Sequence, residues 1–422
     1  MGRERLFLGI DLGTSGIRIA ALDEAGRRRG LLGRPWPHGQ SLNPPVWLHL
    51  SLQLITLLRR RLRTADIAAI AIDGTSGSVL LCHPANGRPL TPVLAYNDGR
   101  ATAEAERLSA AGLKAGPAFG PYGGPAKLLW LTRHDPPQAP AVLTAQGPWL
   151  AGMLAGHHGV LDEHNALKLG FDGAWCEALL QAPLAHHLGP VVAPGTPLGP
   201  LRRDWAWRLG LRTRPLIVAG TTDSTAAYLA LGPLPAGCGV SSLGSTLVLK
   251  IASPRPISVP ELGVYSHRLA ETWLVGGASN SGAAVLAHYF DKAALVRLSA
   301  QLPVTADTRL DYYPLLAPGE RFPINDPCLA PRLTPRPSDD RLFLQGLLEG
   351  LAAIEARGYA LLTHHGAPSL TRVATTGGGA ANGAWRAIRA RSLGVPVSVI
   401  PDRPAAFGAA RLARSAAMAH PP

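Results

Sequence analysis

The chain has 422 residues, which is long enough for two domains that each bury a hydrophobic core. Apolar residues make up 46% of it and charged residues 16%, a balance that excludes an intrinsically disordered protein. The formal net charge is +13, but apart from Arg27–Arg29 and Arg59–Arg61 the basic residues are scattered, and they form no aromatic-interleaved stripe. We therefore interpret the charge as an arginine-rich composition and expect no nucleic-acid partner.

The sequence also predicts no membrane or exported form. No apolar run reaches the roughly 18 residues of a membrane helix, and the residues after Met1 lack the apolar stretch and cleavage site of a signal peptide. The four cysteines form no CxxC pair, so we expect reduced thiols rather than a zinc site or disulfides. We expect a cytoplasmic protein, or a plastid stromal one if the source is a plant. The sequence does not predict an oligomeric state.

In the first half of the chain, predicted strands alternate with a helix. Leucines recur at helical spacing over Trp47–Leu62, which predicts an amphipathic helix, and Asp23–Gly26 has the composition of a turn. Apolar runs predict strands at residues 7–10, 17–22, 67–72 and 79–82. This alternation is typical of an α/β fold.

We place a domain boundary before the predicted strand Pro215–Ala219, which gives domains of residues 1–212 and 213–422. Thr221 and Thr222 then cap a predicted helix that carries Asp223 in its first turn. The segment 239–251 resembles the opening hairpin, which indicates two similar folds in tandem. The remaining predicted elements are a helix at 341–362, a strand at 371–375 and a helix at 382–393.

Three glycine-rich, hydroxyl-bearing segments each accompany a predicted strand: Phe7–Gly16, Ser242–Thr246 and Thr376–Asn382. Glycine lets the backbone approach a phosphate closely, and successive amides then face its oxygens. The candidate donors in the first segment are the amides of Gly13, Thr14 and Ser15, together with the Thr14 hydroxyl. Together the three segments predict a nucleotide held between two lobes.

Two aspartates beside these segments are candidates for the chemistry. Asp11 ends a buried-looking strand, where a carboxylate can hold Mg²⁺ partly through water; a simple turn aspartate is the alternative. Arg18, on the next strand, either reaches the phosphates or points to solvent. Asp223 is the candidate general base that takes the proton of an alcohol during phosphoryl transfer. Its alternative is an aspartate stabilised by the helix dipole.

Further candidates concern the adenosine part of a nucleotide. Gly377–Gly379 with Asn382 can form a flat backbone surface against a purine and ribose. Trp385 either borders the base or packs in the core.

Two motifs in the first half are candidates for binding a sugar. Asp73 and Ser76 lie in DGTS, and Asp98 and Arg100 lie in YNDGR. A hydroxyl, a carboxylate and a guanidinium near one cleft can hydrogen-bond sugar hydroxyls, although each motif alone is also typical of a turn or a surface ion pair. Two alternatives stay open for Lys127 and for the polar segment 162–172: they line a cleft, or they simply connect neighbouring elements.

These motifs together resemble the FGGY family of carbohydrate kinases nearly from end to end. The resemblance rests on GIDLGTSGIRIAALD, YNDGR, KLLWL, GTTDSTAAYLALG, GGGAANGAWRAIRARSLGVPV and AAFGAARLA, in this order. It implies two actin-like, ribonuclease-H-like ATPase domains with an interdomain cleft. It also implies transfer of the ATP γ-phosphate to a sugar hydroxyl, with Mg²⁺ as the metal.

The resemblance assigns roles to particular residues. Asp223 matches the catalytic base of the family, and Asp11 and Thr14 match its metal and phosphate positions. The other matches are Gly244 and Ser245 to the second phosphate loop, and Gly378, Gly379 and Asn382 to the adenosine site.

Three departures from the family pattern bear on the substrate. The chain is shorter than many members, Tyr96 replaces the tryptophan of Trp-x-Asp-x-Arg, and SLGST stands where many relatives have GTS. With IDGTS and HNALKLGFD, these features look most like a short xylulokinase-like group of cyanobacteria and plants that is similar to D-ribulose kinases. We therefore expect a D-ribulose kinase in which Asp223 deprotonates the 5-hydroxyl.

Several alternatives stay open at this point. A kinase for D-xylulose or another polyol would use the same chemistry, because ketopentoses differ in the direction of one hydroxyl. An actin-superfold ATPase would share the fold, and a non-catalytic sugar or nucleotide sensor would bind without turnover. DGTS, YNDGR and the Asp223 loop favour a small hydroxylic substrate.

Overall fold

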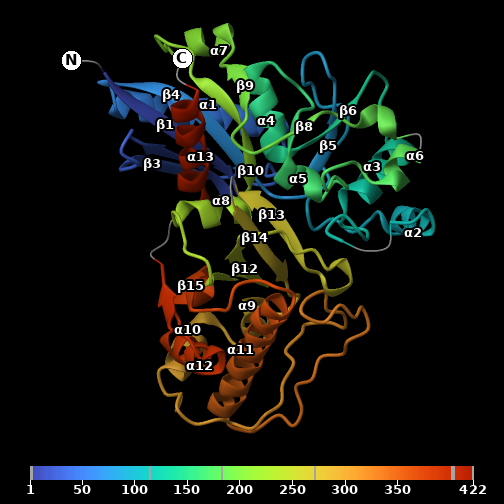
Figure 1. Cartoon of the computed structure of the whole chain (residues 1–422), viewed down its shortest axis with the longest axis vertical. Coiled ribbons are helices and arrows are strands. Elements are labelled where there is room, and N and C mark those ends of the chain that lie inside the picture. The colour runs from blue at the N-terminus through green and yellow to red at the C-terminus, as the bar shows by residue number, and fades with distance from the viewer. Residues whose placement is uncertain (1–2, 114–115, 182–183, 270–271, 401–403, 421–422) are drawn as a thin grey trace. The chain divides into compact units, whose positions relative to one another are not determined.

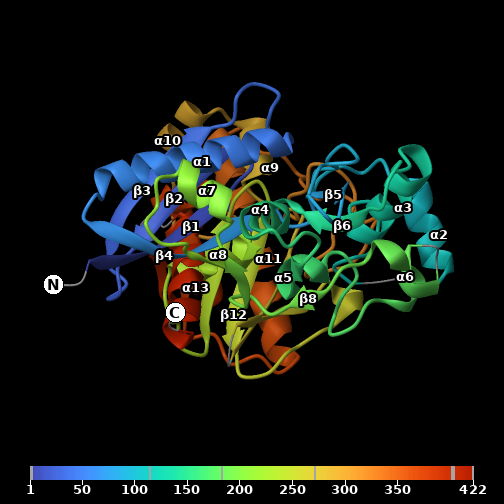
Figure 2. The same cartoon turned by 90° about the horizontal axis from the view of Figure 1, so that it is seen from above.

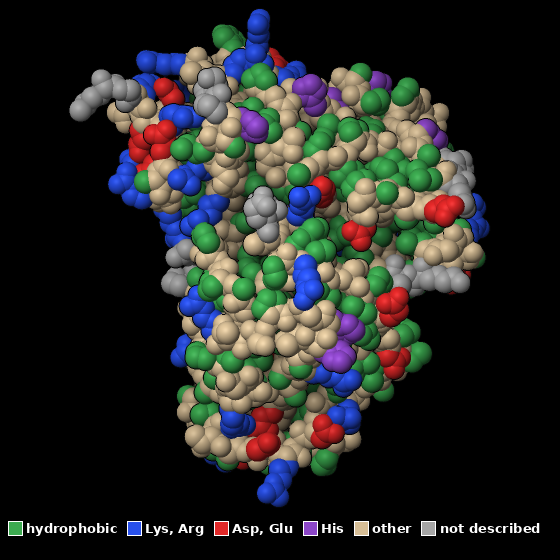
Figure 3. Space-filling model, in the orientation of Figure 1, with side chains coloured by type: hydrophobic (Ala, Val, Ile, Leu, Met, Phe, Trp, Pro, Cys, Tyr) green, Lys and Arg blue, Asp and Glu red, His purple; other side chains and the backbone are tan. Residues whose placement is uncertain are grey.

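The computed structural model describes residues 3–113, 116–181, 184–269, 272–400 and 404–420 (Figure 1). The chain forms two compact α/β units. The first comprises residues 1–233 and 403–422, and the second comprises residues 234–402. Basic side chains do not gather into one patch on the face that Figure 3 shows, where acidic side chains lie among them.

The first unit contains ten strands and nine α-helices among the described residues. The strands are β1 (Glu4–Leu12), β2 (Gly16–Leu22), β3 (Arg28–Pro35), β4 (Ala65–Gly74), β5 (Val79–Cys82), β6 (Val142–Ala145), β7 (Leu161–Asp162), β8 (Val191–Val192), β9 (Pro197–Pro200) and β10 (Leu216–Thr222). The helices are α1 (Pro44–Arg61), α2 (Thr102–Ala110), α3 (Gly124–His134), α4 (Gln146–Ala155), α5 (Glu163–Leu167), α6 (Glu177–Gln181), α7 (Arg203–Arg208), α8 (Asp223–Ala230) and α13 (Ala405–Ala419), with a 3₁₀ turn η1 (Ala185–His187).

The main sheet of the first unit has the strand order β3-β2-β1-β4-β10-β9. β1 pairs antiparallel with β2 and parallel with β4, which pairs parallel with β10. Side chains alternate between the two faces of a strand. Leu8 and Ile10 therefore pack with Trp47 of α1 on one face, whereas Phe7 packs with Ala409 of α13 on the other. Figure 2 shows α1 and α13 on opposite sides of β1 and β4.

The observed division differs from the predicted boundary between residues 212 and 213. β10 and α8 follow that boundary but belong to the first unit, because β10 extends the sheet alongside β4. The C-terminal helix α13 also returns to the first unit, where it packs on β1 and α8. The helix α13 was not expected from the sequence pattern.

The second unit contains six strands and four α-helices among the described residues. They are β11 (Cys238–Leu243), β12 (Leu247–Ser253), β13 (Tyr265–Leu269), β14 (Thr272–Ala278), β15 (Arg372–Thr376), β16 (Val397–Val399), α9 (Ala283–Tyr289), α10 (Lys292–Ser299), α11 (Asp340–His364) and α12 (Gly383–Leu393), with 3₁₀ turns η2 (Pro260–Leu262) and η3 (Gly378–Ala381). The sheet order is β13-β14-β12-β11-β15-β16.

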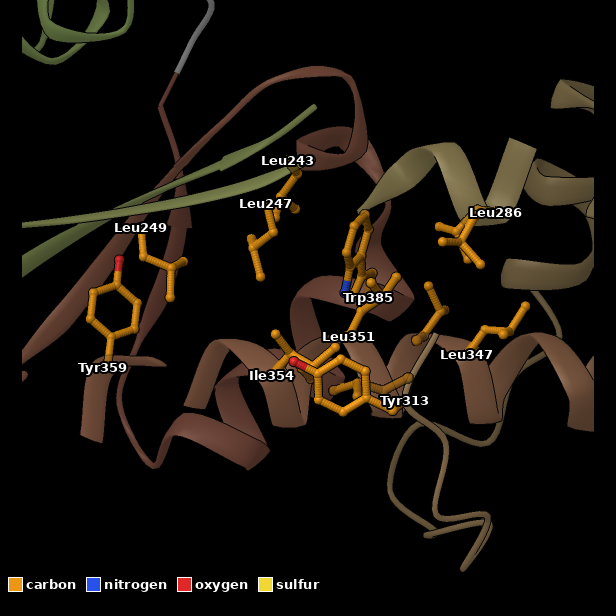
Figure 4. Packing of buried hydrophobic residues seen from close by; sticks show 14 of the residues in the cluster. Leu243, Leu247, Leu249, Leu286, Tyr313, Leu347, Leu351, Ile354, Tyr359 and Trp385 are labelled. Atoms are coloured by element: carbon orange, nitrogen blue, oxygen red, sulfur yellow. The ribbon is translucent and has the colours of Figure 1, made fainter. Parts of the chain in front are cut away.

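The two units share a strand arrangement. The hairpin β11–β12 is antiparallel, and β11 pairs parallel with β15, just as β1 pairs with β2 and β4. The hydrophobic core of the second unit lies between this sheet and α11, where Leu351 and Ile354 lie near Trp385 of α12 (Figure 4). The tandem similarity predicted from the two hairpins therefore matches the observed topology.

Close packing of α13 on α8 depends on one glycine. A Cβ at Gly408 would lie 1.8 Å from the Ala226 carbonyl oxygen, a backbone atom that cannot turn aside. We predict that Gly408→Ala destabilises the first unit by about 1–3 kcal/mol, the usual cost of overpacking a core, and lowers its thermal unfolding midpoint in calorimetry. Met418→Ala on the exposed side of the same helix is the control. An unchanged midpoint for Gly408→Ala would contradict this packing.

Candidate active site

Acidic residues of the first unit gather at one edge of its sheet. In the register of the parallel strands, Asp11 of β1 is paired with Asp73 of β4, which is paired with Thr221 of β10. Asp223 follows as the first residue of α8. Because the carboxyl ends of parallel strands meet at one edge, residues from three distant parts of the sequence come together here.

Asp73 is the most unusual of these residues. Its side chain is fully buried, and neither carboxylate oxygen has a hydrogen-bond partner in the described part of the chain. Burial, together with the nearby charges of Asp11 and Asp223, raises its pKa well above the usual value. We expected Asp73 to face a sugar, but the structure buries it beside Asp11 instead.

Asp11 is only 3% exposed. The Arg18 Nη1 donates a hydrogen bond of 3.3 Å to its Oδ2. Burial raises the pKa of Asp11, and the Arg18 charge opposes this only in part. The sequence left open whether Arg18 reaches the phosphates or points to solvent. In the structure Arg18 is paired with Asp11.

The first glycine-rich turn is held in shape by its own backbone and by Trp36. The Gly13 amide donates to the Gly16 carbonyl at 3.0 Å, and the Trp36 indole donates to the Gly13 carbonyl at 2.8 Å. Thr14 and Ser15 at the tip are exposed. The turn therefore keeps its shape without a ligand. The Gly13 amide, a predicted phosphate donor, is already bonded within the turn, so the candidate donors are those of Thr14 and Ser15.

Asp223 is partly exposed at the start of α8. Its Oδ1 accepts a 2.7 Å hydrogen bond from the Ser224 amide. Burial raises the pKa of Asp223 to about 6, although the Ser224 amide and the charge of Lys168 oppose this. A carboxylate with this pKa is poised to accept a proton near neutral pH.

Buried polar contacts behind Asp223 were not anticipated from the sequence. His164 of α5 lies with its Nδ1 2.7 Å from the Thr221 hydroxyl, and both side chains are buried. The Asp162 side chain caps α5 by accepting from the Asn165 amide at 2.9 Å. The only sequence signal was the polar segment 162–172, which also supplies Lys168.

The DGTS and YNDGR motifs lie together in the structure. Lys127 of α3 is fully buried, and its Nζ donates to the carbonyls of Gly77 and Ala95, at 2.9 and 2.5 Å. Burial lowers the pKa of Lys127 to about 8. The Gln146 side chain accepts from the Thr75 amide at 3.0 Å and from its hydroxyl at 2.7 Å. The buried contacts of Lys127 and Gln146 therefore fix the backbone of the DGTS and YNDGR motifs.

The side chains that were predicted to contact the sugar differ in whether they already have a hydrogen-bond partner. Ser76 is half-buried, and no hydrogen bond of its side chain is found among the described residues. The Arg100 Nε donates to Asp98 Oδ1 at 2.9 Å, and the guanidinium lies 5.1 Å from the Trp130 ring centroid. Burial raises the pKa of Asp98, but the hydrogen bonds and charge of Arg100 outweigh it and hold the pKa below the usual value. Asp98 and Arg100 are thus already paired.

In the second unit, the other two glycine-rich segments lie side by side. β11 leads into Gly244 and Ser245, and the parallel strand β15 leads into Gly377–Gly379. Gly377 has φ +87°, and a Cβ on it would lie 2.8 Å from the Leu243 carbonyl oxygen. Ser245 and Gly378 are exposed, and a Cβ on Gly378 would meet no atom within 4 Å. The two turns together form an open backbone surface.

Asn382 and Trp385 have structural roles next to this surface. The Asn382 Oδ1 caps α12 by accepting from the Trp385 amide at 3.0 Å, and its Nδ2 donates to Ser299 Oγ at 2.9 Å. Trp385 is only 2% exposed and lies in the core (Figure 4), with its ring directly beneath Gly379. Of the two interpretations of Trp385, its burial favours core packing, in which the ring supports the turn from beneath Gly379.

The residues at the acidic edge fit a magnesium ion. Within the described part of the chain, no group of three or more His, Cys, Asp or Glu side chains is arranged to hold a metal. Magnesium, however, is commonly bound by one or two carboxylates and completes its shell with water and phosphate oxygens. Asp11 and the unpartnered oxygens of Asp73 offer two such carboxylates.

Comparison with known proteins agrees with these features. Residues 6–230 match the N-terminal domain, and residues 239–417 the C-terminal domain, of the FGGY family of carbohydrate kinases. The chain is 29% identical to the xylulose kinase of Escherichia coli K12 over 444 residues, covering 98% of this chain and 90% of that protein. A xylulose kinase from Klebsiella pneumoniae is 28% identical over 461 residues, covering 97% and 90%.

Solved structures show the same architecture. A xylulose kinase from Brucella ovis superposes with a TM-score of 0.85 and 27% identity, covering 98% of this chain and 91% of that one. No helix among the described residues is long and apolar enough to cross a membrane. The family matches span most of the sequence, the fold is that of FGGY sugar kinases, and the chain is a member of the FGGY family of carbohydrate kinases.

Proposed function

We propose that this protein transfers the γ-phosphate of ATP to a terminal hydroxyl of a ketopentose. The observation that carries the proposal is Asp223, a partly exposed carboxylate whose pKa is raised to about 6, close to the acidic edge formed by Asp11 and Asp73. Phosphoryl transfer to an alcohol needs a base of this kind to take the hydroxyl proton. Asp223 is that base in our proposal.

The two units contribute different groups. In the first unit, the turn with Thr14 and Ser15 donates hydrogen bonds to phosphate oxygens, and Asp11 with Asp73 holds Mg²⁺, which neutralises phosphate charge when bound. In the second unit, Gly244 and Ser245 face phosphate oxygens. The backbone of Gly378 and Gly379 receives the adenosine, with Asn382 and Trp385 fixing that backbone.

The proposal also concerns which ketopentose is the substrate. Two relatives that match nearly the whole chain are xylulose kinases, so D-xylulose becomes the first candidate. D-ribulose, which the sequence motifs favoured, is the second, because no comparison supports it specifically. Candidate sugar contacts among the described residues near DGTS are Ser76, Lys168 and the exposed rings of Tyr96 and Tyr122.

An ADP-release assay with Mg-ATP and a panel of D-xylulose, D-ribulose, L-xylulose, L-ribulose, glycerol and no sugar tests the proposal. We expect a ketopentose to be preferred, and Asp223→Asn to lower turnover about 100-fold or more because the base is lost, with ADP affinity unchanged in calorimetry. A rate independent of any sugar would instead indicate an ATPase of the actin superfold. Binding of sugar and nucleotide without turnover would indicate a sensor.

The raised pKa of Asp223 predicts a pH dependence. Below pH about 6 the carboxyl is protonated and cannot act as a base, so kcat/KM for the ketopentose should rise about tenfold per pH unit up to that value and level off above it. The measurement is kcat/KM between pH 5 and 8.5. Asp223→Glu is the control: it should shift the midpoint, whereas a midpoint set by ionisation of ATP would stay. A flat profile would contradict the assignment.

The magnesium assignment makes a prediction that does not depend on turnover. Asp73→Asn should weaken Mn²⁺ binding roughly tenfold or more, as loss of a group that supports a metal site does, measured by electron paramagnetic resonance of the free ion. The thermal unfolding midpoint in EDTA should not fall, because the substitution removes a buried carboxyl that lies beside the like charges of Asp11 and Asp223. Wild-type Mn²⁺ affinity in Asp73→Asn would remove Asp73 from the site.

A further inference from the structure

A buried ion pair joins two helices of the second unit. Arg389 of α12 and Glu355 of α11 are each 1% exposed. The Arg389 Nε donates to Glu355 Oε2 at 2.5 Å, and its Nη2 donates to Oε1 at 2.7 Å. The contact is therefore bidentate, the geometry in which a guanidinium holds a carboxylate most rigidly.

The same pair reaches the two central strands of the sheet. The Arg389 Nη1 donates to the Thr375 hydroxyl of β15 at 2.8 Å, and the Ser241 hydroxyl of β11 donates to Glu355 Oε1. The Tyr359 hydroxyl lies 3.0 Å from Ser241 Oγ. Four elements, β11, β15, α11 and α12, thus meet in one buried network whose polar groups have partners.

The network lies immediately before both glycine-rich turns of this unit. Ser241 and Thr375 are partners in the parallel register of β11 and β15. Ser241 is three residues before Gly244, and Thr375 is two residues before Gly377. Arg389 lies on the helix that begins directly after the third turn. The two strands that lead into the open surface, β11 and β15, therefore bond to the ion pair, and α12, which follows the third turn, carries Arg389.

Stability does not account for placing two charges here. Removing an arginine and a glutamate from water is costly, and replacing such a pair by apolar residues of similar size is often neutral or stabilising. The surroundings are hydrophobic, since Trp385, Ile388 and Leu351 of the same helices are in the core. An apolar pair would fill the space, but it would not bond the Ser241 and Thr375 side chains of these strands to α11 and α12.

We propose that Glu355 and Arg389 are positioning residues for the nucleotide: their buried pair fixes the two glycine-rich turns of the second unit relative to each other. The proposal rests on the proposed function, in which these turns receive the adenosine and phosphates of ATP. Neither residue touches the ligand, and both act through Ser241 and Thr375.

The test compares wild-type protein, Glu355→Gln and the double variant Glu355→Leu, Arg389→Met. Circular dichroism and thermal unfolding report folding, and calorimetry reports the Kd values of ADP and of the preferred ketopentose. We expect the double variant to stay folded, because its side chains fill the same space without a buried charge. Its Kd for ADP should rise about tenfold or more, with KM for ATP rising further than kcat falls. The Kd of the ketopentose should not change.

A second ion pair on the same two helices provides a matched control. Arg391 of α12 bonds to Glu349 of α11 at 3.1 Å, but Arg391 is 36% exposed and neither residue bonds to β11 or β15 in the described structure. Arg391→Met should leave the Kd for ADP within about twofold of wild type. A merely structural role for Glu355 would lower the active fraction, and hence kcat, without raising KM.

The outcomes separate the two proposals. A folded double variant with wild-type affinity for ADP would overturn the positioning role and leave the kinase proposal standing. A wild-type protein that binds no ADP would overturn the proposed function and the positioning role with it. Weaker ADP binding in Glu355→Gln and in the double variant, with ketopentose binding intact, would support the inference.

Discussion

Parallel pairing of strands that are distant in the sequence is the constraint on which the rest of this structure depends. β1 pairs with β4, and β4 with β10, so their carboxyl ends share an edge. That pairing brings Asp11, Asp73 and Thr221 into register and places Asp223 next along the chain. The same arrangement in the second unit, β11 with β15, sets two glycine-rich turns beside each other. Without these pairings each motif would be an isolated turn.

Burying Asp11 and Asp73 side by side is electrostatically unfavourable, and the single arginine nearby offsets this only in part. Asp73 is buried with no hydrogen-bond partner found in the described residues, and Asp11 has one arginine at 3.3 Å. Buried carboxylates of like charge raise each other's pKa and disfavour the charged form. Groups with strongly perturbed pKa values gather where a protein binds or transforms a ligand, and a cation at this edge would relieve the repulsion. The acidic edge therefore has the perturbed electrostatics that are typical of a ligand site.

The second unit also buries charged side chains, but there they have partners. Its charges are buried as a complete network, with Arg389 and Glu355 bonded to each other and to the strands. The glycine-rich turns that follow carry no charged side chain of their own, so their shape depends on what holds the strands. A fully satisfied polar network specifies one arrangement more strictly than an apolar core does. In our two proposals, the unsatisfied acidic edge binds the metal ion and the satisfied network positions the turns.

The sequence alone determined the local structure and the kinds of residue available. Periodicity located α1 and α11, apolar runs located β1, β2 and β4, and the glycine-rich segments identified the turns, because these features depend on neighbouring residues. The family followed from the order of those motifs. Only the tertiary structure decided that Asp73 is buried beside Asp11, that Trp385 supports a turn from within the core, and that Arg389 joins two strands. It also decided that β10 and α13 belong to the first unit. Contacts of this kind join residues up to about 400 positions apart, as between Gly9 and Ala406, and no local pattern encodes which distant strand will be the partner.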